Sequence, residues 1–141
     1  MADRKAPTVI YERLGWDDLA ADHLMRDGTS REGVQSIAAE VAANKQALYG
    51  IFVEGNRVGS ICYTAHEDVG GRVLFVTGMG ADPTDGLSLI ADAFNNFLPK
   101  QAKANFCSIL RIWTQREGFL RVLRGAGCRT FYVMETDLGH E

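Results

Sequence analysis

The sequence predicts a single α+β domain, more narrowly an α/β arrangement in which helices flank one mixed β-sheet. Three observations carry this prediction. The 141 residues suit one domain, and their 46% hydrophobic content is ordinary for one core. The hydrophobic periodicity changes along the chain from strand alternation to helical spacing and back. The resulting order, β-α-α-β-β-β-α-β-α-β, requires crossovers as well as hairpins, so we expect a mixed sheet within a domain spanning residues 1–141, with its core over about 8–137.

The first half of the chain contains an opening strand, two helices and a three-stranded meander. Asp17 and Asp18 precede a helical apolar stripe, where acidic groups favour a helix N-terminus. His23 lies on that stripe, and we interpret it as a core or substrate-edge residue rather than a catalytic one. The turn Glu54-Gly55-Asn56 suits a hairpin because its residues tolerate positive φ. The expected elements are a strand over 8–13, a helix over 16–25, a helix with its apolar stripe over 34–42, and strands over 47–53, 57–64 and 72–77.

The second half begins with a glycine-rich loop over 78–86, between a strand and a long helix. That helix starts near Leu87, and Pro99 is expected to end or kink it, since proline lacks the amide N–H that continues a helix. The remaining expected elements are a strand over 106–113, a short amphipathic helix over 115–123 and a last strand over 130–135.

Composition restricts the classes of partner. The net charge of −3 gives no broad electrostatic case for nucleic acid, although it allows a local basic patch. The three cysteines show no metal-binding spacing, so we interpret them as reduced and mostly buried. The polar N-terminus predicts no secretory signal, and no window has the roughly 20 apolar residues of a membrane span. We therefore expect a cytoplasmic protein without a membrane partner.

Two segments resemble a known superfamily. The hairpin over 48–64 contains Tyr-Gly-Ile-Phe-Val-Glu-Gly-Asn-Arg-Val-Gly-Ser-Ile, and residues 109–133 give a strand, a short helix, a glycine turn and a strand. Together with the element order, these segments resemble the GNAT N-acyltransferase superfamily over residues 8–137. The resemblance implies transfer of an acetyl or other acyl group from acyl-CoA to an amine, carried by a small molecule or a protein. It also allows a homodimer.

The resemblance further implies where acyl-CoA would bind. In this superfamily two neighbouring strands separate, and the pantetheine arm pairs with the exposed strand edge. The corresponding strands here cover 72–77 and 106–113. A helix N-terminus then holds the pyrophosphate with its backbone amides. The residues assigned in this way to acetyl-CoA or another acyl-CoA are Val76, Thr77, Gly78, Gly86, Leu87, Ser88, Trp113 and Arg116.

Acyl transfer also needs a route for a proton from the amine. His66 and Glu67 lie together at the end of an expected strand, and we assign them as candidate catalytic residues. The alternative interpretation is a solvated turn, because Asp68, Gly70 and Gly71 follow immediately.

Some positions depart from the superfamily pattern and support a second hypothesis. Pro83 stands where the phosphate loop usually has Gln or Arg, and Asp82 and Asp85 add negative charge there. Leu123 stands where many members have a Tyr that protonates the departing thiolate. The alternative is a catalytically degenerate GNAT-fold protein that acts in binding or structure, such as a phage virion component or a binder of a host protein.

Overall fold

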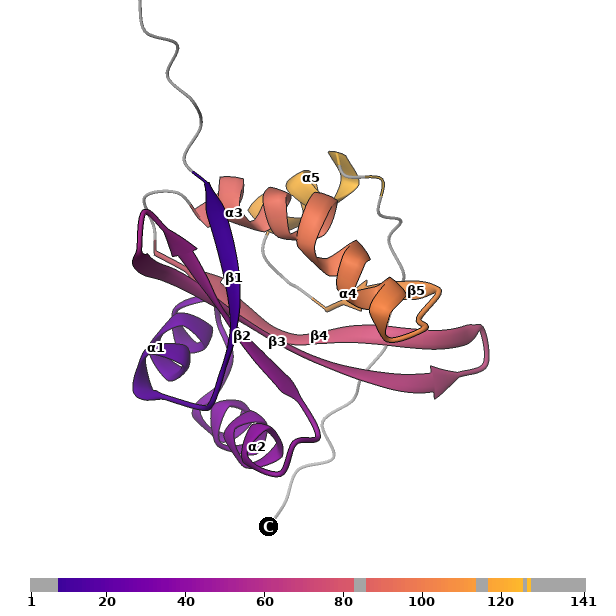
Figure 1. Ribbon diagram of the computed structural model, residues 1–141, viewed down its shortest axis with the longest axis horizontal. Coiled ribbons are helices and arrows are strands. Elements are labelled where there is room, and N and C mark those ends of the chain that lie inside the picture. Colours follow the sequence, from indigo (N-terminus) through magenta and orange to yellow (C-terminus); the bar gives the residue numbers. More distant parts are fainter. Residues whose placement is uncertain (1–7, 83–85, 114–116, 126, 128–141) are drawn as a thin grey trace, which may run out of the picture.

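The computed structural model describes residues 8–82, 86–113, 117–125 and 127. Within these ranges the fold contains five strands and a set of helices (Figure 1). The elements are β1 (Val9–Leu14), α1 (Asp18–Arg26), α2 (Arg31–Ala42), β2 (Ala47–Val53), β3 (Asn56–Asp68), β4 (Gly71–Ala81), α3 (Gly86–Asp92), the π-helical segment η1 (Ala93–Phe97), α4 (Leu98–Ala104), β5 (Ile109–Ile112) and α5 (Glu117–Gly125). The strand expected over 130–135 lies outside the described residues.

The five strands form one mixed sheet in the order β1-β2-β3-β4-β5. The first three pairings are antiparallel, and β4 pairs with β5 in parallel. The mixed sheet that the sequence predicts is therefore confirmed. The β2–β3 turn is also as expected, since Glu54 and Gly55 both have positive φ.

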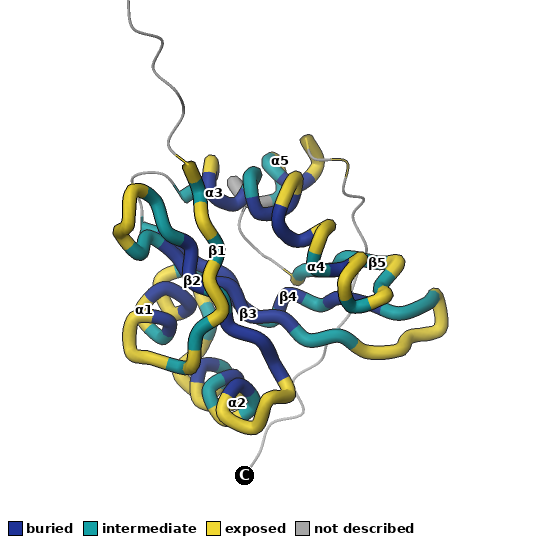
Figure 2. The backbone as a smooth tube through the Cα atoms, in the orientation of Figure 1, coloured by how far each residue is buried: buried dark blue, intermediate teal, exposed yellow. Residues whose placement is uncertain are grey.

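Helices cover both faces of the sheet (Figure 1). One face carries α1 and α2, and a buried cluster that includes Leu24, Ile37, Leu48 and Cys62 fills the space beneath them. The opposite face carries α3, η1, α4 and α5 over a larger core. Figure 2 shows that burial is concentrated in the central strands and in the inner sides of the helices, while the outer end of the β3–β4 hairpin is exposed.

The glycine loop expected over 78–86 is wrong in its first half, because Gly78 and Gly80 belong to β4. These glycines allow α1 to lie close to the strand. A Cβ atom on Gly78 would lie 2.6 Å from Leu24 Cδ2, and one on Gly80 would lie 2.0 Å from the backbone oxygen of His23. Their presence in the sequence therefore reflects helix–sheet packing rather than loop formation.

The helix that contains Pro99 does not end there. Helical structure runs from Gly86 to Ala104, and η1 ends at Phe97, two residues before Pro99. The Leu98 N–H bonds to the Ala93 carbonyl, five residues earlier, so the turn is wider than an α-turn. A wider turn accommodates the proline ring and its missing N–H, which would otherwise disturb the α-helical ladder.

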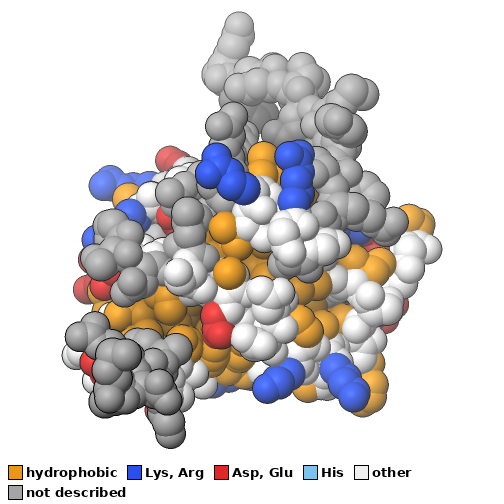
Figure 3. All heavy atoms as spheres, turned by 90° about the horizontal axis from the view of Figure 1, so that it is seen from above, with side chains coloured by type: hydrophobic (Ala, Val, Ile, Leu, Met, Phe, Trp, Pro, Cys, Tyr) orange, Lys and Arg blue, Asp and Glu red, His pale blue; other side chains and the backbone are white. Residues whose placement is uncertain are grey.

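The face that includes α3 and α5 is mixed in character. Seen from the top of Figure 1, apolar side chains gather near its centre, with Lys and Arg side chains toward its margins (Figure 3). In the described part of the chain, no helix is long and apolar enough to cross a membrane.

Candidate functional site

The parallel pairing of β4 with β5 ends at Val76. Their pairing runs from Val73 with Ile109 to Val76 with Ile112, where β5 ends. Strand β4 continues to Ala81 and remains paired with β3 on its other side. Among the described residues, no strand pairs with β4 from Thr77 to Ala81 on the β5 side. An unpaired strand edge of this kind can accept an extended ligand as an added strand.

A β-bulge lies in the β3–β4 ladder, next to the point where the pairing of β4 with β5 ends. Cys62 of β3 is opposite Gly78, but the next residue, Tyr63, is opposite Val76. Thr77 is thus the extra residue of β4, and the ladder to β3 is locally interrupted there. Both neighbouring ladders of β4 are therefore broken at one residue.

The Thr77 hydroxyl is held from the α2 side of the sheet. Thr77 Oγ1 donates to Gln46 Oε1 at 2.5 Å. Gln46 is buried, and its Nε2 donates to Glu40 Oε2 on α2 at 3.2 Å. Gln46 and Glu40 belong to no recognisable motif, so their roles could not be predicted from the sequence.

Helix α3 begins at Gly86, shortly after β4 ends at Ala81. Gly86 begins α3, Leu87 follows in its first turn, and the Ser88 side chain is exposed. Residues 83–85, which include Pro83 and Asp85, lie outside the described residues. The first-turn amides of α3 are candidates for binding an anion.

Asp82, just before that segment, is directed toward α1. Its Oδ1 accepts a hydrogen bond from Arg26 Nη1 at 2.9 Å and lies 3.5 Å from His23 Nε2. Arg26 therefore offsets the Asp82 charge. This arrangement weakens the argument that Asp82 repels a phosphate at the α3 N-terminus.

Trp113 directly follows the last paired residue of β5. Its side chain is 63% exposed, and its ring lies edge-on to Phe75 with centroids 5.1 Å apart. By strand alternation, Phe75 shares a sheet face with Thr77. The two aromatic rings therefore stand near the point of separation on the face that carries Thr77. Arg116, the other residue assigned to the cofactor from this region, lies outside the described residues.

The structure does not bring His66 and Glu67 together. They are consecutive in β3, so they point to opposite faces of the sheet. Glu67 forms an exposed ion pair with Arg72 at 3.2 Å, and His66 lies against Phe75 with ring centroids 6.3 Å apart. His66 pairs with Val73, four positions before Thr77, which corresponds to about 13 Å along a strand.

Leu123 is a core residue of α5. Its side chain is 4% exposed and belongs to the larger apolar cluster. An apolar side chain at this position supplies no proton to a leaving group. Tyr132, which follows in sequence, lies outside the described residues.

A buried polar group lies between α1 and β3. His23 is 1% exposed, as the sequence analysis expected for a core histidine, and its Nδ1 lies 2.7 Å from Ser60 Oγ. Arg57 Nη2 donates to Ser60 Oγ at 2.9 Å, and Arg57 also pairs with Asp17, the N-cap of α1. Burial would raise the pKa of Asp17, but hydrogen bonds from Arg57 and Ala20 lower it overall. Because Ser60 is fully buried, this group is structural and offers no accessible nucleophile.

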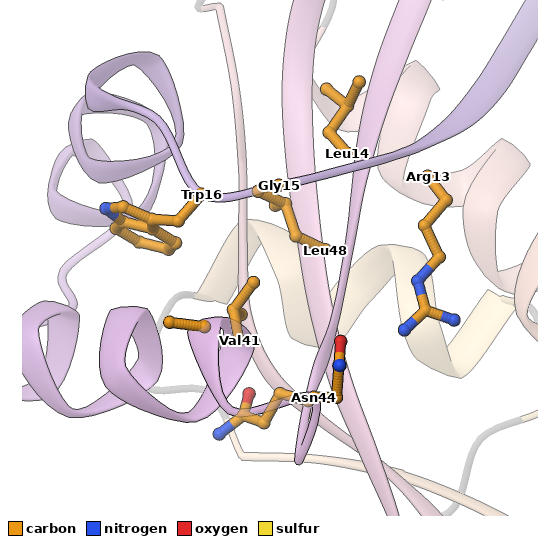
Figure 4. Close-up of a pocket in the computed structure, with 9 residues that line it drawn as sticks. Arg13, Leu14, Gly15, Trp16, Val41, Asn44 and Leu48 are labelled. Atoms are coloured by element: carbon orange, nitrogen blue, oxygen red, sulfur yellow. The ribbon is translucent and has the colours of Figure 1, made fainter.

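A separate pocket of about 580 Å³ lies beside β1 and the end of α2 (Figure 4). Trp16, Val41 and Leu48 form its apolar side, while Arg13 and Asn44 contribute polar groups. Gln46 also lines it. Through Gln46, the pocket wall is connected by a hydrogen bond to Thr77.

Comparison with known proteins supports the fold. No protein-family model and no curated protein matches the sequence. Similar solved structures include a predicted acetyltransferase with acetyl-CoA from Clostridium acetobutylicum, at 16% identity over 93% of this chain and 97% of that one, with a TM-score of 0.68. A ribosomal-protein-alanine N-acetyltransferase from Brucella melitensis biovar Abortus 2308 has 19% identity over 94% and 100% of the two chains, with a TM-score of 0.67.

An aminoglycoside acetyltransferase from an uncultured soil metagenomic sample, in complex with sisomicin, is similar at 13% identity over 94% and 97% of the two chains, with a TM-score of 0.64. These comparisons agree with the element order and the mixed sheet. The chain has the fold of the GNAT acetyltransferases, as the sequence resemblance implied.

Proposed function

We propose that this chain is an N-acyltransferase that moves an acetyl or other acyl group from acyl-CoA to an amine. The observation that carries the proposal is that, among the described residues, no strand pairs with β4 from Thr77 to Ala81 on the side where β5 ends at Ile112. A broken parallel pairing next to a β-bulge leaves backbone donors and acceptors available to a ligand.

The pantetheine arm has amides spaced along an extended chain, and it would pair with the β4 edge in the manner of an added strand. Its pyrophosphate would then lie at the first turn of α3, at Gly86, Leu87 and Ser88. Trp113 would line the other side of the opening, because it follows the last paired residue of β5. These contacts would bring the thioester near Thr77.

The reaction balances without a metal or a redox partner. The amine nitrogen attacks the thioester carbonyl carbon, a C–N bond forms and the C–S bond breaks. The nitrogen loses a proton and the CoA thiolate gains one, so the products are an amide and free CoA. Leu123 cannot donate that proton, so water is the expected carrier between nitrogen and sulfur in this protein.

Calorimetric titration with acetyl-CoA tests the proposal. We expect saturable binding, a rise in Tm with ligand concentration, and release of free thiol when an amine is added. Pantetheine alone, which lacks the pyrophosphate, should bind more weakly than acetyl-CoA. The absence of both heat and a Tm shift at millimolar acetyl-CoA would contradict the proposal.

The same titration separates the enzyme from the degenerate alternative. Leu123 in the core is the observation that favours that alternative, since the usual proton donor is missing. A protein without CoA affinity that forms a stable complex with one other protein would support it. Binding of acetyl-CoA with thiol release would exclude it.

A further inference from the structure

The hydroxyl of Thr77 has a defined polarity. Gln46 is 5% exposed and lies between Glu40 and Thr77. A carboxylate accepts hydrogen bonds, so Glu40 requires the NH₂ group of the Gln46 amide, and the amide oxygen then faces Thr77. The Thr77 hydroxyl must therefore donate its only proton to the Gln46 amide oxygen. Its oxygen keeps a free lone pair, and within the described residues no group donates to it.

This oxygen lies where the ladders on both sides of β4 are interrupted. The register to β3 shifts around Thr77, and the pairing to β5 ends one residue earlier, at Val76. A group that lies along β4 beyond the end of β5 at Ile112 therefore passes Thr77. A hydroxyl oxygen that can only accept would select a partner with an N–H or O–H donor.

We propose that Thr77 Oγ1 accepts a hydrogen bond from the N–H of the acceptor amine and so directs the nitrogen lone pair at the acyl carbon. Gln46 and Glu40 are positioning residues, which act by fixing the direction of the Thr77 proton. The inference rests on the proposed acyltransferase function and deepens it, because it selects donors at the acceptor site. Thr77 takes no proton in the reaction; the nitrogen proton still leaves to water.

Substitution of the hydroxyl tests this role. Thr77→Val keeps the shape of the side chain and removes the oxygen, while Thr77→Ser keeps the oxygen. We expect Thr77→Val to lower kcat/KM for the amine about tenfold, the usual magnitude for one lost hydrogen bond, and Thr77→Ser to restore most of it. Thr64→Val is the matched control, because Thr64 lies on the neighbouring strand β3 and its Oγ1 donates to the Lys45 backbone oxygen at 3.2 Å. It should change kcat/KM less than about twofold.

The probe amine is the fastest of four compounds: phenethylamine, spermidine, glucosamine and a peptide with a free α-amino group. The dissociation constant of acetyl-CoA is measured for each variant and should not change. A merely structural role would lower acetyl-CoA affinity and Tm together with activity. If Thr77→Val fails to fold, Glu40→Gln on half-buried α2 surface replaces it, with an expected loss of about threefold because the Gln46 amide can then turn over.

The outcomes separate the two proposals. Wild-type protein without acetyl-CoA affinity would overturn the acyltransferase function and this role with it. Wild-type protein that binds acetyl-CoA but acylates none of the four amines would overturn the role. Equal kcat/KM values for wild type and Thr77→Val, with acetyl-CoA binding intact, would overturn the role alone.

Discussion

His23 and Ser60 form a buried hydrogen bond, Nδ1 to Oγ at 2.7 Å, between α1 and β3. Arg57 can only donate to Ser60 Oγ, and the Asp82 carboxylate beside His23 Nε2 can only accept, so the arrangement that suits these groups sends the Ser60 proton to His23 Nδ1. The imidazole proton then lies at Nε2, which faces Asp82 Oδ1 at 3.5 Å. This neutral tautomer is assigned from the hydrogen-bond network. A second proton on His23 would break the bond from Ser60.

The stability of the protein should depend on the charge of His23. Burial lowers the pKa of His23 below its ordinary value; Asp82 opposes this, and Arg57 and Arg26 add to it. A histidine with a lowered folded-state pKa stabilises the fold above its unfolded pKa of about 6.5 and loses that contribution as the pH falls toward the folded value. We expect the urea concentration at the unfolding midpoint to decrease as the pH is lowered from about 7.5 to about 5.

Two variants isolate this effect from other titrating groups. His23→Gln should reduce the change in urea midpoint between the two pH values, because the buried site no longer titrates. His66→Gln, at an exposed position, should leave the change as in the wild type. Equal pH dependence in His23→Gln and the wild type would show that other residues control it.

Gly80 should not tolerate a side chain. A Cβ atom there would lie 2.0 Å from the backbone oxygen of His23, and neither backbone can move without separating α1 from β4. Gly80→Ala should lower the free energy of unfolding by about 2 kcal/mol or more, as expected for overpacking. Gly125→Ala is the control, since no atom lies within 4 Å of its added Cβ. Chemical denaturation compares them, and similar values for the two variants would contradict the close approach.

The sequence predicted the mixed sheet because strand alternation, helical stripes and turn residues agree along the described chain. It did not predict the lengths of β3 and β4, which extend to Asp68 and Ala81. Glycine usually interrupts strands, so Gly78 and Gly80 indicated a loop, whereas the contact with α1 requires them within β4. Such a long-range contact leaves no local signal.

The candidate site shows the same limit. The superfamily resemblance implied the positions of Val76 and Thr77, and the structure places both where the pairing of β4 with β5 ends. Adjacency in sequence suggested that His66 and Glu67 act together, but strand alternation directs them to opposite faces. Gln46 precedes β2 and reaches Thr77 only through the folded sheet, so its contact could not be predicted from sequence.

Phe106 adopts an unfavourable backbone conformation. Its φ is 59°, and its side chain is 87% exposed, so little packing compensates. Asparagine tolerates this region better than other residues with a side chain. Phe106→Asn should therefore raise the free energy of unfolding by up to about 1 kcal/mol, measured by urea titration. Val69→Asn, also fully exposed but without positive φ, should change it by less than about 0.5 kcal/mol. A destabilised Phe106→Asn would reveal packing of the ring.

Ser88 offers a test of anion binding at α3 that does not depend on damage to the fold. Its side chain is exposed in the first turn of α3, where a negative charge stabilises a helix by about 0.3–1 kcal/mol. The same charge would repel the pyrophosphate of acyl-CoA by roughly 1 kcal/mol at close range in water. Ser88→Glu should therefore keep or raise Tm while weakening acetyl-CoA binding about fivefold, and the loss should shrink at high salt. Ser88→Gln, of nearly the same size but neutral, should bind as the wild type does. Equal acetyl-CoA affinities for Ser88→Glu and Ser88→Gln would place the pyrophosphate elsewhere, because a charge near its site cannot be without effect.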